Sequence, residues 1–398
     1  MKGKALYGTG MDCSKAFDMC SWLVLFQDLV ERNVSVVFLR VLLFTYRYQS
    51  CDVRWNGKYS FRFPVSNGVK QGSVASPLLW ACYCEKLFLQ IRRMKIGATI
   101  AGVFYGILIY ADDIFLLCPS RDGLQAMVSE CERFASERNL LFSTNPVARK
   151  SKTKSIIFSK VASERENVAP IMLNGLPLPW VTSMLHLGNT LQEDNSMSMD
   201  CAIKRGQFIG KFHSLSQEFY YLSPDVKTKL LLLNGTCFYA SSLWNLFSAQ
   251  VERLYTSWNQ AIRQIFSVPR TTHRFFIEPL SDCHHPKTML CARMVKFWQT
   301  LTTCMKPAVR ILAGICKMNT KTVFGSNLVN IARECNCKVT DLTPSLVKQN
   351  LRYAAAPEQD QYKISFVKEL VMIKSQDMMV DNFSNQELFD IIDYLCTS

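Results

Sequence analysis

The sequence predicts an α+β protein, in which an antiparallel sheet packs against helices and a mostly helical second half follows. Two apolar segments of extended character, 100 residues apart, each end at aspartate: one at Asp12, the other at Asp112. The segments between them repeat apolar residues at helical spacing. Beyond about residue 195 the periodicity is almost wholly helical, which predicts a helical second half.

The first half of the chain alternates between short strands and longer helices. Asn56 and Gly57 stand between two alternating apolar stretches, which is typical of a β-hairpin. Strands are expected at 5–11, 103–110, 114–117 and 154–158, and helices at 14–32, 34–46, 78–91 and 121–138. The proline- and glycine-rich residues 170–179 indicate a domain boundary.

The composition excludes disordered and collagen-like proteins, because 48% of the 398 residues are hydrophobic and 20% are charged. The net charge is +14, and it is distributed unevenly. Residues 1–160 carry +10 and residues 270–354 carry +9, whereas residues 355–398 carry −5. Such a basic excess favours a polyanionic partner, either nucleic acid or an anionic membrane surface.

The cysteines and the long apolar run indicate an intracellular protein without a membrane span. The 16 cysteines are scattered through apolar stretches, and no signal peptide precedes them, which favours a reducing compartment. The longest uncharged run, 230–251, has the length of a membrane span. It contains Asn234, Asn245 and Gln250, so we interpret it as buried helix.

Asp112 and Asp113 form an acidic turn between two apolar strands. Charges between buried strands are costly unless they are paired or bound to metal. A single antiparallel sheet would bring Asp12 to Asp112, and carboxylates without neighbouring His or Cys favour Mg²⁺ or Mn²⁺. In a basic protein this predicts phosphoryl transfer on nucleic acid. A solvated hairpin turn is the alternative, since aspartate is favoured in turns.

Four segments of the sequence resemble, in the same order, the palm motifs of reverse transcriptases. They are Asp12-Cys13-Ser14-Lys15-Ala16-Phe17-Asp18, Gly68-Val69-Lys70-Gln71-Gly72-Ser73, Ser76-Pro77-Leu78-Leu79 and Tyr110-Ala111-Asp112-Asp113. The continuations Ser151-Lys152-Thr153-Lys154 and His186-Leu187-Gly188 are similar to the next two motifs of the non-LTR, LINE-type retrotransposon branch. The resemblance covers about residues 5–195.

The resemblance implies that Asp12 and Asp112 are the catalytic ligands of two Mg²⁺ (or Mn²⁺) ions. It makes Asp113 their acidic neighbour in the metal site, and it makes the Cys13 backbone carbonyl a further ligand. Asp18, in contrast, is expected to be structural or to start a helix.

The same resemblance assigns residues to nucleotide and primer binding. Phe17 matches the aromatic residue that excludes a 2′-hydroxyl, and Gln71 and Gly72 match the loop that contacts the incoming nucleotide and template. Lys154, with Lys152 as the alternative, falls where the family places a catalytic lysine near the pyrophosphate. Leu187 and Gly188 match the primer-grip turn.

Each of these assignments has a structural alternative. The alternatives are a core aromatic residue for Phe17, a turn glycine for Gly72 and a solvated basic face for the two lysines. Ser73 departs from the family pattern, because many relatives have aspartate there. This departure weakens the case for template contact in that loop.

The resemblance also predicts how the chain is divided. We expect a reverse-transcriptase palm at 1–170, a helical thumb-like region at 171–269 and a basic helical C-terminal region with an acidic tail at 270–398. Only eleven residues precede Asp12, where the family has its fingers subdomain. The fingers are therefore expected to be largely absent, and the chain is expected to be a fragment.

Two features of the second half suggest binding sites of their own. Cys283, His284, His285 and Cys291, with Cys335 and Cys337, suggest zinc, but no pair of cysteines has the C-x₂-C spacing and buried or surface thiols are favoured. Residues 270–354 interleave cations such as Arg293 and Lys296 with Phe297 and Trp298, a pattern suited to RNA. A helical bundle with a solvated basic face is the alternative.

The predicted function is that of an RNA-directed DNA polymerase of a non-LTR retrotransposon. Its partners would be an RNA template, a DNA primer or target and deoxynucleoside triphosphates, with the nucleus as its place of action on DNA. One rival is a catalytically inactive remnant without fingers that still binds nucleic acid. Another is a maturase- or telomerase-like protein, of whose additional domains the sequence carries no sign.

Overall fold

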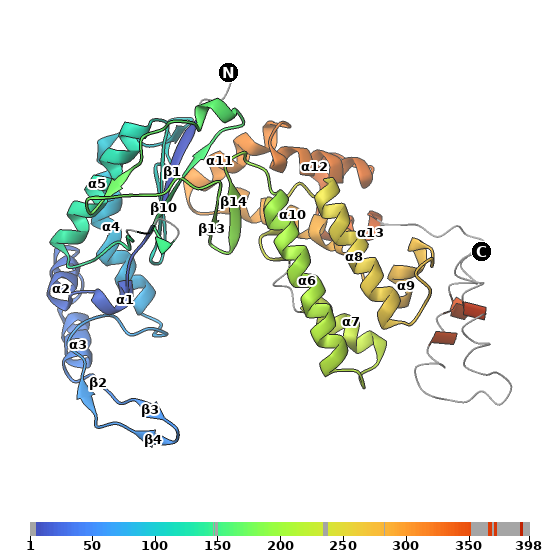
Figure 1. The fold of residues 1–398 in the computed structure, drawn as a ribbon, viewed down its shortest axis with the longest axis horizontal. Coiled ribbons are helices and arrows are strands. Elements are labelled where there is room, and N and C mark those ends of the chain that lie inside the picture. The colour runs from blue at the N-terminus through green and yellow to red at the C-terminus, as the bar shows by residue number, and fades with distance from the viewer. Residues whose placement is uncertain are drawn as a thin grey trace. The chain divides into compact units, whose positions relative to one another are not determined.

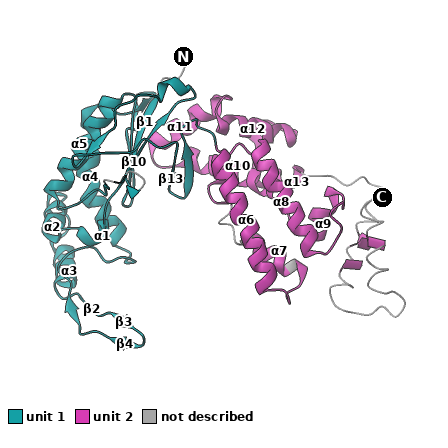
Figure 2. Ribbon diagram, in the orientation of Figure 1, with its two compact units in different colours: residues 1–196 teal, residues 197–398 magenta. Residues whose placement is uncertain are grey.

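A computed structural model of the chain describes residues 5–145, 147, 150–233, 238–281, 283–351, 365–367, 370–371 and 391–392. The chain forms two compact units, Met1–Ser196 and Met197–Ser398 (Figure 2). Residues 170–179 belong to the first unit, and most of the predicted acidic tail falls outside the described residues. The division into palm, thumb-like and C-terminal regions stays a prediction.

The first unit is organised around a four-stranded antiparallel sheet (Figure 1). Its strands lie in the order β10 (Lys154–Phe158), β1 (Leu6–Asp12), β9 (Asp113–Cys118) and β8 (Ile107–Tyr110). The predicted antiparallel sheet is therefore confirmed, and β1 lies beside β9 although about half of the unit's sequence separates them.

One face of the sheet carries the core of the first unit. Met11, Ile114 and Leu116 are buried there in one hydrophobic cluster with residues of α4 (Ser76–Met94) and α5 (Arg121–Glu137). Because side chains alternate along a strand, Phe115 and Ile156 belong to the other face, where they form a small cluster with Met184. The sheet thus has a helix-covered face and a second, thinly covered face.

The predicted helix at 14–32 divides into α1 (Ala16–Met19) and α2 (Trp22–Glu31). The break lies at Cys20, whose backbone is extended and whose carbonyl oxygen accepts a hydrogen bond from the amide of Gly68 at 2.9 Å. Helical spacing alone does not reveal this break, because apolar residues continue on both sides of it.

The segment between α2 and α4 holds a helix and two short ladders. Helix α3 (Val36–Arg47) is followed by β2 (Ser50–Cys51), β3 (Arg54–Trp55), β4 (Lys58–Tyr59) and β5 (Phe63–Pro64). Strands β3 and β4 pair around Asn56 and Gly57, which both have positive φ angles, so the predicted hairpin is confirmed.

The predicted strand at 103–110 also divides in two. β7 (Val103–Phe104) pairs with β6 (Thr99–Ile100), and β8 then joins the main sheet. The first unit closes with a 3-10 turn at Ala162–Glu164 and two hairpins, β11 (Met172–Leu173) with β12 (Leu176–Pro177) and β13 (Ser183–His186) with β14 (Asn189–Gln192).

All the regular secondary structure in the described residues of the second unit is helical, as predicted. Its helices are α6 (Ser198–Glu218), α7 (Pro224–Leu233), α8 (Ala249–Ile265), α9 (Ile277–Ser281), α10 (Pro286–Thr303), α11 (Pro307–Met318), α12 (Val323–Glu334) and α13 (Pro344–Asn350). Trp244 and Trp258 lie in its core. None of the helices in the described part of the chain has both the length and the apolarity needed to cross a bilayer.

Candidate functional site

The pairing of β1 with β9 brings the predicted carboxylates to one end of the sheet. In this register Asp12 stands opposite Asp113, which also pairs with Tyr110 across the β8–β9 hairpin. The turn of that hairpin consists of Ala111 and Asp112. Paired residues of antiparallel strands point to the same face, so Asp12 and Asp113 share the face that the core helices leave uncovered.

The charges of these aspartates act on one another and on Cys13. Burial raises the pKa of the Cys13 thiol to about 12, and the negative charges of Asp112 and then Asp12 add to the increase. Burial also raises the pKa of Asp113, and the charge of Asp112 contributes next. The three carboxylates therefore lie within one shared electrostatic field.

The backbone at Asp12 is held from two sides. Its amide donates to the hydroxyl of Thr153 at 3.1 Å, and its carbonyl oxygen accepts from the amide of Ser143 at 2.8 Å. The amide of Ser14 completes the bridge beyond the strand by donating to Leu141. These hydrogen bonds involve the carbonyl oxygen of Asp12 but not that of Cys13.

The oxygens of these carboxylates suit a hard cation. Within the described residues, Asp12, Asp112 and Asp113 make no side-chain hydrogen bond and no ion pair, so their lone pairs are open to a ligand. The part of the chain that the structure describes contains no group of three or more His, Cys, Asp or Glu side chains that could together hold a metal. The carboxylates at the ends of two adjacent strands therefore provide the oxygen donors that Mg²⁺ or Mn²⁺ prefers.

The turn that carries Asp112 is fixed by a tryptophan. Ala111 adopts a left-handed backbone (φ 53°), a conformation that is costly for a residue with a side chain. Its carbonyl oxygen accepts a hydrogen bond of 2.7 Å from Nε1 of Trp80, which lies on α4 and is 1% exposed. Sequence reasoning missed Trp80, because in the sequence it is only one more apolar position of a helix.

Phe17 joins the same group of contacts. Its ring is half-buried on α1, and the ring centroid lies 5.4 Å from that of Trp80. Its carbonyl oxygen accepts from the amide of Val69 at 2.7 Å, which ties α1 to the loop that follows Gly68. Phe17 thus bridges that loop and the tryptophan that holds the Asp112 turn.

Gln71 and Gly72 lie exposed in this loop, which is anchored at both ends. The Gly68 carbonyl accepts from Nε1 of Trp22 at 2.7 Å, and the Lys70 carbonyl accepts from the Ser76 hydroxyl at 2.6 Å. Gly72 has a φ of +81°, which suits a turn glycine. A Cβ placed there would meet nothing within 4 Å, so the space beside this glycine also allows a ligand to approach the backbone closely.

The predicted lysines and the predicted primer-grip turn lie on other strands of the first unit. Lys154 is half-buried on β10 opposite Gly10, and Lys152 is exposed just before the strand. Leu187 and Gly188 form the two-residue turn between β13 and β14, with φ angles of 47° and 74°. Whether any of these residues contacts a substrate stays a prediction.

His186, next to that turn, connects the β13–β14 hairpin to the carboxylate strand. Its ring lies 4.8 Å from that of Phe115 on β9. Burial lowers the pKa of His186, while the charge of Asp113 acts in the opposite direction. The hairpin therefore packs on the thinly covered face that Asp12 and Asp113 share.

Three of the Cys and His residues that the sequence suggested for zinc, namely His285, Cys291 and Cys335, are buried in the core of the second unit. His285 is fully buried, with Nε2 at 3.1 Å from Oδ1 of Asn259 and Nδ1 accepting from the amide of Lys287. Burial lowers the pKa of His285 well below its usual value. Cys291 and Cys335 are buried in the hydrophobic cluster of the second unit.

Comparison with known proteins agrees with the motifs. Residues 1–158 match the family described as reverse transcriptase (RNA-dependent DNA polymerase). The retrovirus-related Pol polyprotein from type-1 retrotransposable element R2 of Nasonia vitripennis is 29% identical over 143 residues, which are 35% of this chain and 14% of that protein. The polyprotein from type-2 retrotransposable element R2DM of Drosophila melanogaster is 29% identical over 133 residues, 33% of this chain and 12% of that protein.

The chain thus spans less than a sixth of either polyprotein. Among solved structures, telomerase from Candida tropicalis with a fragment of telomeric RNA gives a TM-score of 0.35 at 12% identity, covering 98% of this chain and 49% of that one. An apo form of this telomerase gives 0.31 at 14%, covering 48% and 34%. Residues 1–158 are thus similar to reverse transcriptases, and the two polyproteins that resemble this part of the chain come from retrotransposable elements.

Proposed function

We propose that this chain is the RNA-directed DNA polymerase part of a non-LTR retrotransposon and that it adds deoxynucleotides to a primer 3′-hydroxyl by two-metal catalysis. The observation that carries the proposal is the register of β1 with β9, which sets Asp12 opposite Asp113 and leaves Asp112 in the adjoining turn. The two Pol polyproteins that resemble the chain support the same reaction class.

Asp12 and Asp112 would hold Mg²⁺ or Mn²⁺, with Asp113 beside them and the Cys13 carbonyl as a further ligand. When bound, the ions supply positive charge that favours an ionised 3′-hydroxyl and neutralises the pyrophosphate leaving group. The chain's own part is to keep the carboxylates in place and unpaired. The Cys13 thiol, with its pKa at about 12, stays neutral at pH 7 and adds no charge to the site.

The residues around the carboxylates would select and align the nucleotide. Phe17, held against Trp80, would exclude a 2′-hydroxyl, and the exposed Gln71 and Gly72 would contact the incoming nucleotide and template. Lys154, or Lys152, would meet the charge of the leaving pyrophosphate. Alignment of this kind supplies much of the catalysis in phosphoryl transfer.

The substrates follow from the reaction. They are an RNA template, a DNA primer or target strand and deoxynucleoside triphosphates, and the Leu187–Gly188 turn would hold the primer end. The charge of +10 on residues 1–160 favours such polyanionic partners. Action on a DNA target would take place in the nucleus.

Primer extension on a poly(rA) template with an oligo(dT) primer and Mg²⁺ tests the proposal. The wild-type chain should extend the primer, and Asp112→Asn should lower the rate by orders of magnitude while the affinity for template–primer stays the same. Glu164→Gln removes one carboxylate elsewhere in the same unit and should leave the rate unchanged.

A nucleic-acid-binding remnant without catalysis is the alternative function, and the same assay separates the two. A wild-type chain that binds template–primer in a salt-sensitive manner but extends no primer with either Mg²⁺ or Mn²⁺ would favour the remnant. Equal rates for wild type and Asp112→Asn would contradict the assignment of the metal ligands.

A further inference from the structure

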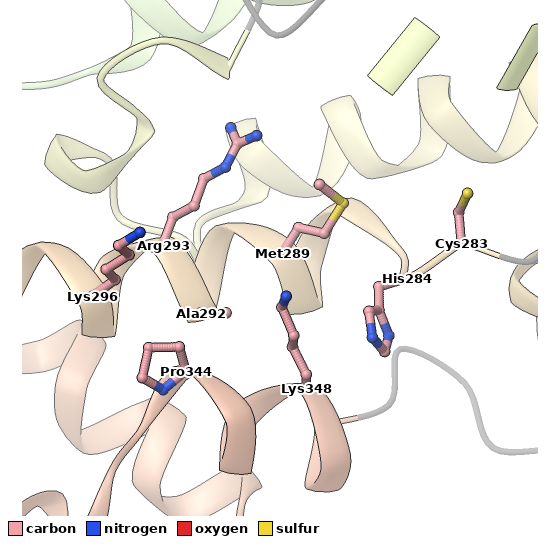
Figure 3. A pocket seen from close by; sticks show the side chains of 8 residues that line it. All are labelled: Cys283, His284, Met289, Ala292, Arg293, Lys296, Pro344 and Lys348. Atoms are coloured by element: carbon pink, nitrogen blue, oxygen red, sulfur yellow. The ribbon is translucent and has the colours of Figure 1, made fainter. Parts of the chain in front are cut away.

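The second unit contains a cavity of about 350 Å³ between α10 and α13, shown in Figure 3. A cavity of this size is at the lower end of the range that accommodates small molecules and nucleotides. Three of the side chains that line it are cations, Arg293 and Lys296 from α10 and Lys348 from α13, and none is acidic. The cavity therefore suits a ligand with negative charge.

The sequence of α10 explains how the cavity is lined. Met289, Ala292, Arg293 and Lys296 follow one another at intervals of three, one and three residues, so they share one face of the helix. The opposite face carries buried residues, including Cys291 and Met294. On α13 the same relationship holds for Pro344 and Lys348, which are four residues apart.

The two helices hold the cavity in a fixed form. The hydroxyl of Thr288 on α10 donates to the carbonyl of Leu351 after α13 at 3.1 Å, and this bond is buried. Val347 on α13 is fully buried in the same hydrophobic cluster as Leu290. The cations are therefore presented by a rigid base, which lowers the entropic cost of binding.

The charges of the cavity are available to a ligand. Arg293, Lys296 and Lys348 are exposed and make no ion pair with any described residue. Lys287, on the same helix, differs, because its Nζ pairs with Glu334 at 2.8 Å. The cavity thus combines three cations that the described residues leave unneutralised with the apolar surface of Met289, Ala292 and Pro344.

We infer that this cavity binds the phosphodiester backbone of a nucleic acid strand. Arg293, Lys296 and Lys348 would contact phosphate oxygens, and the apolar side chains would contact a sugar or base of the same nucleotide. A single strand fits this combination, because its bases are free to leave the stack. The inference rests on the proposed function in one respect, namely that the ligand is the nucleic acid on which the chain acts.

Binding of a fluorescent single-stranded RNA to the whole chain, followed by anisotropy over a range of salt concentrations, tests the inference. The test variant replaces Arg293, Lys296 and Lys348 with Gln. The control variant replaces Lys306, Lys321 and Lys338 with Gln, because these three exposed lysines of the same unit lie outside the cavity. Both variants lose the same net charge, and thermal melting checks that both fold.

The cavity variant should raise the Kd at least tenfold, and the control should change it by much less. Each lost phosphate contact should also reduce the slope of log Kd against log salt by about 0.7, so the slope should fall by about 2 in the cavity variant. Equal changes in Kd for the two variants would show that only the net charge affects binding, and would overturn the inference.

Crosslinking with RNA that contains 4-thiouridine locates the contact. Crosslinked peptides from α10 or α13 are expected, and their absence, with crosslinks only elsewhere, would overturn the inference. Inorganic phosphate and a nucleoside monophosphate serve as competitors. If either displaced the RNA at a concentration well below 1 mM, the cavity would be a site for a small anion instead of a strand.

The outcome separates this inference from the proposed function. Asp112→Asn should bind RNA as the wild type does and fail to extend a primer, whereas the cavity variant should extend at the wild-type rate once template–primer is saturating. Weaker RNA binding with an unchanged rate of extension at saturating template–primer supports the inference about the cavity alone. Unchanged binding in the cavity variant overturns the cavity and leaves the polymerase proposal as it stands.

Discussion

The indole of Trp80 donates a hydrogen bond of 2.7 Å to the carbonyl oxygen of Ala111. Ala111 is the left-handed residue of the turn that carries Asp112, and the Trp80 ring also packs on Phe17 at 5.4 Å. One buried side chain therefore connects the conformation of the acidic turn to the residue assigned to sugar selection. We expect Trp80 to act as a positioning residue, since it makes both contacts from within the core.

Trp80→Phe keeps an aromatic ring in the core and removes the donor together with part of the indole. The unfolding free energy should fall by about 1–2 kcal/mol, because the Ala111 carbonyl loses its partner. Primer extension should show kcat reduced about tenfold to a hundredfold, as expected for a displaced carboxylate, with a smaller change in KM for the nucleotide. The Mg²⁺ concentration for half-maximal rate should rise.

Trp180→Phe is the control for this substitution. Trp180 also donates from Nε1 to a backbone carbonyl, that of Ala169, at 3.3 Å in the same unit. It should alter stability without changing the Mg²⁺ requirement. If Trp80→Phe lowered stability but left kcat and the Mg²⁺ requirement unchanged, Trp80 would be structural only.

Gly68 is a position where only glycine fits. Its φ is +85°, and a Cβ placed there would lie 2.8 Å from the Asp18 carbonyl oxygen and 2.9 Å from that of Phe17. Gly68→Ala should therefore push the loop that carries Gln71 away from α1, because both neighbouring atoms belong to the backbone. Steady-state kinetics should show KM for the nucleotide raised severalfold.

Gly57→Ala provides the matched control for Gly68→Ala. Gly57 also has a positive φ, +76°, but a Cβ there would meet nothing within 4 Å. The two substitutions thus share the backbone strain and differ in the steric clash. A similar rise in KM for both variants would show that strain, and not contact with α1, is responsible.

The main sheet and the order of its motifs were predictable from the sequence, whereas the contacts that position the site were not. Asp12 and Asp112 follow apolar strands, so the direction of the strands brings them to one end of the sheet. The break at Cys20 and the bond from Trp80 depend on what Gly68 and Ala111 meet in three dimensions. Local periodicity carries no information on such long-range partners.

Phe17→Ala should relax the choice of sugar. If the ring excludes a 2′-hydroxyl, its removal should raise incorporation of ribonucleotides relative to deoxynucleotides at least tenfold, a change of about 1.4 kcal/mol in discrimination. Competitive incorporation of UTP and dTTP opposite poly(rA) measures the ratio. Phe17→Tyr, which keeps the ring, should retain the selectivity.

Phe26→Ala controls for the loss of packing. Phe26 is also a half-buried aromatic residue packed on the same core, but it lies on α2. It should lower stability and leave the ratio unchanged. An unchanged ratio in Phe17→Ala would support the reading of Phe17 as a core residue.

Asp28 and Arg138 form a buried ion pair in the first unit. Arg138 contacts the carboxylate with both terminal nitrogens, at 2.7 and 3.2 Å, and its guanidinium lies 4.8 Å from the rings of Tyr83 and Phe134. Arg138→Met would leave a buried carboxylate whose one remaining charged partner among the described residues is Lys86. The unfolding free energy at pH 7 should fall by about 3–5 kcal/mol.

The pH dependence of this loss follows from the pKa of Asp28. Burial by itself raises that pKa, but hydrogen bonds from Arg138 and Lys86 outweigh burial, and the pKa lies below its ordinary value of 3.8. The unfolded chain therefore binds the proton more tightly, so the contribution is complete above pH 3.8 and is lost as the pH falls through the lower folded pKa. The difference in unfolding free energy between wild type and Arg138→Met should become smaller in that acidic range.

Hydrogen exchange of the α2 and α5 amides at pH 7, together with urea unfolding repeated at lower pH, measures these effects in the first unit. Arg133→Met is the control, because Arg133 pairs with Glu130 and Glu137 on the exposed face of α5 and exposed pairs contribute little. It should leave protection almost unchanged at every pH. If Arg138→Met and Arg133→Met behaved alike, or if the stability difference widened in acid, the ion pair would not stabilise the unit in the way its geometry indicates.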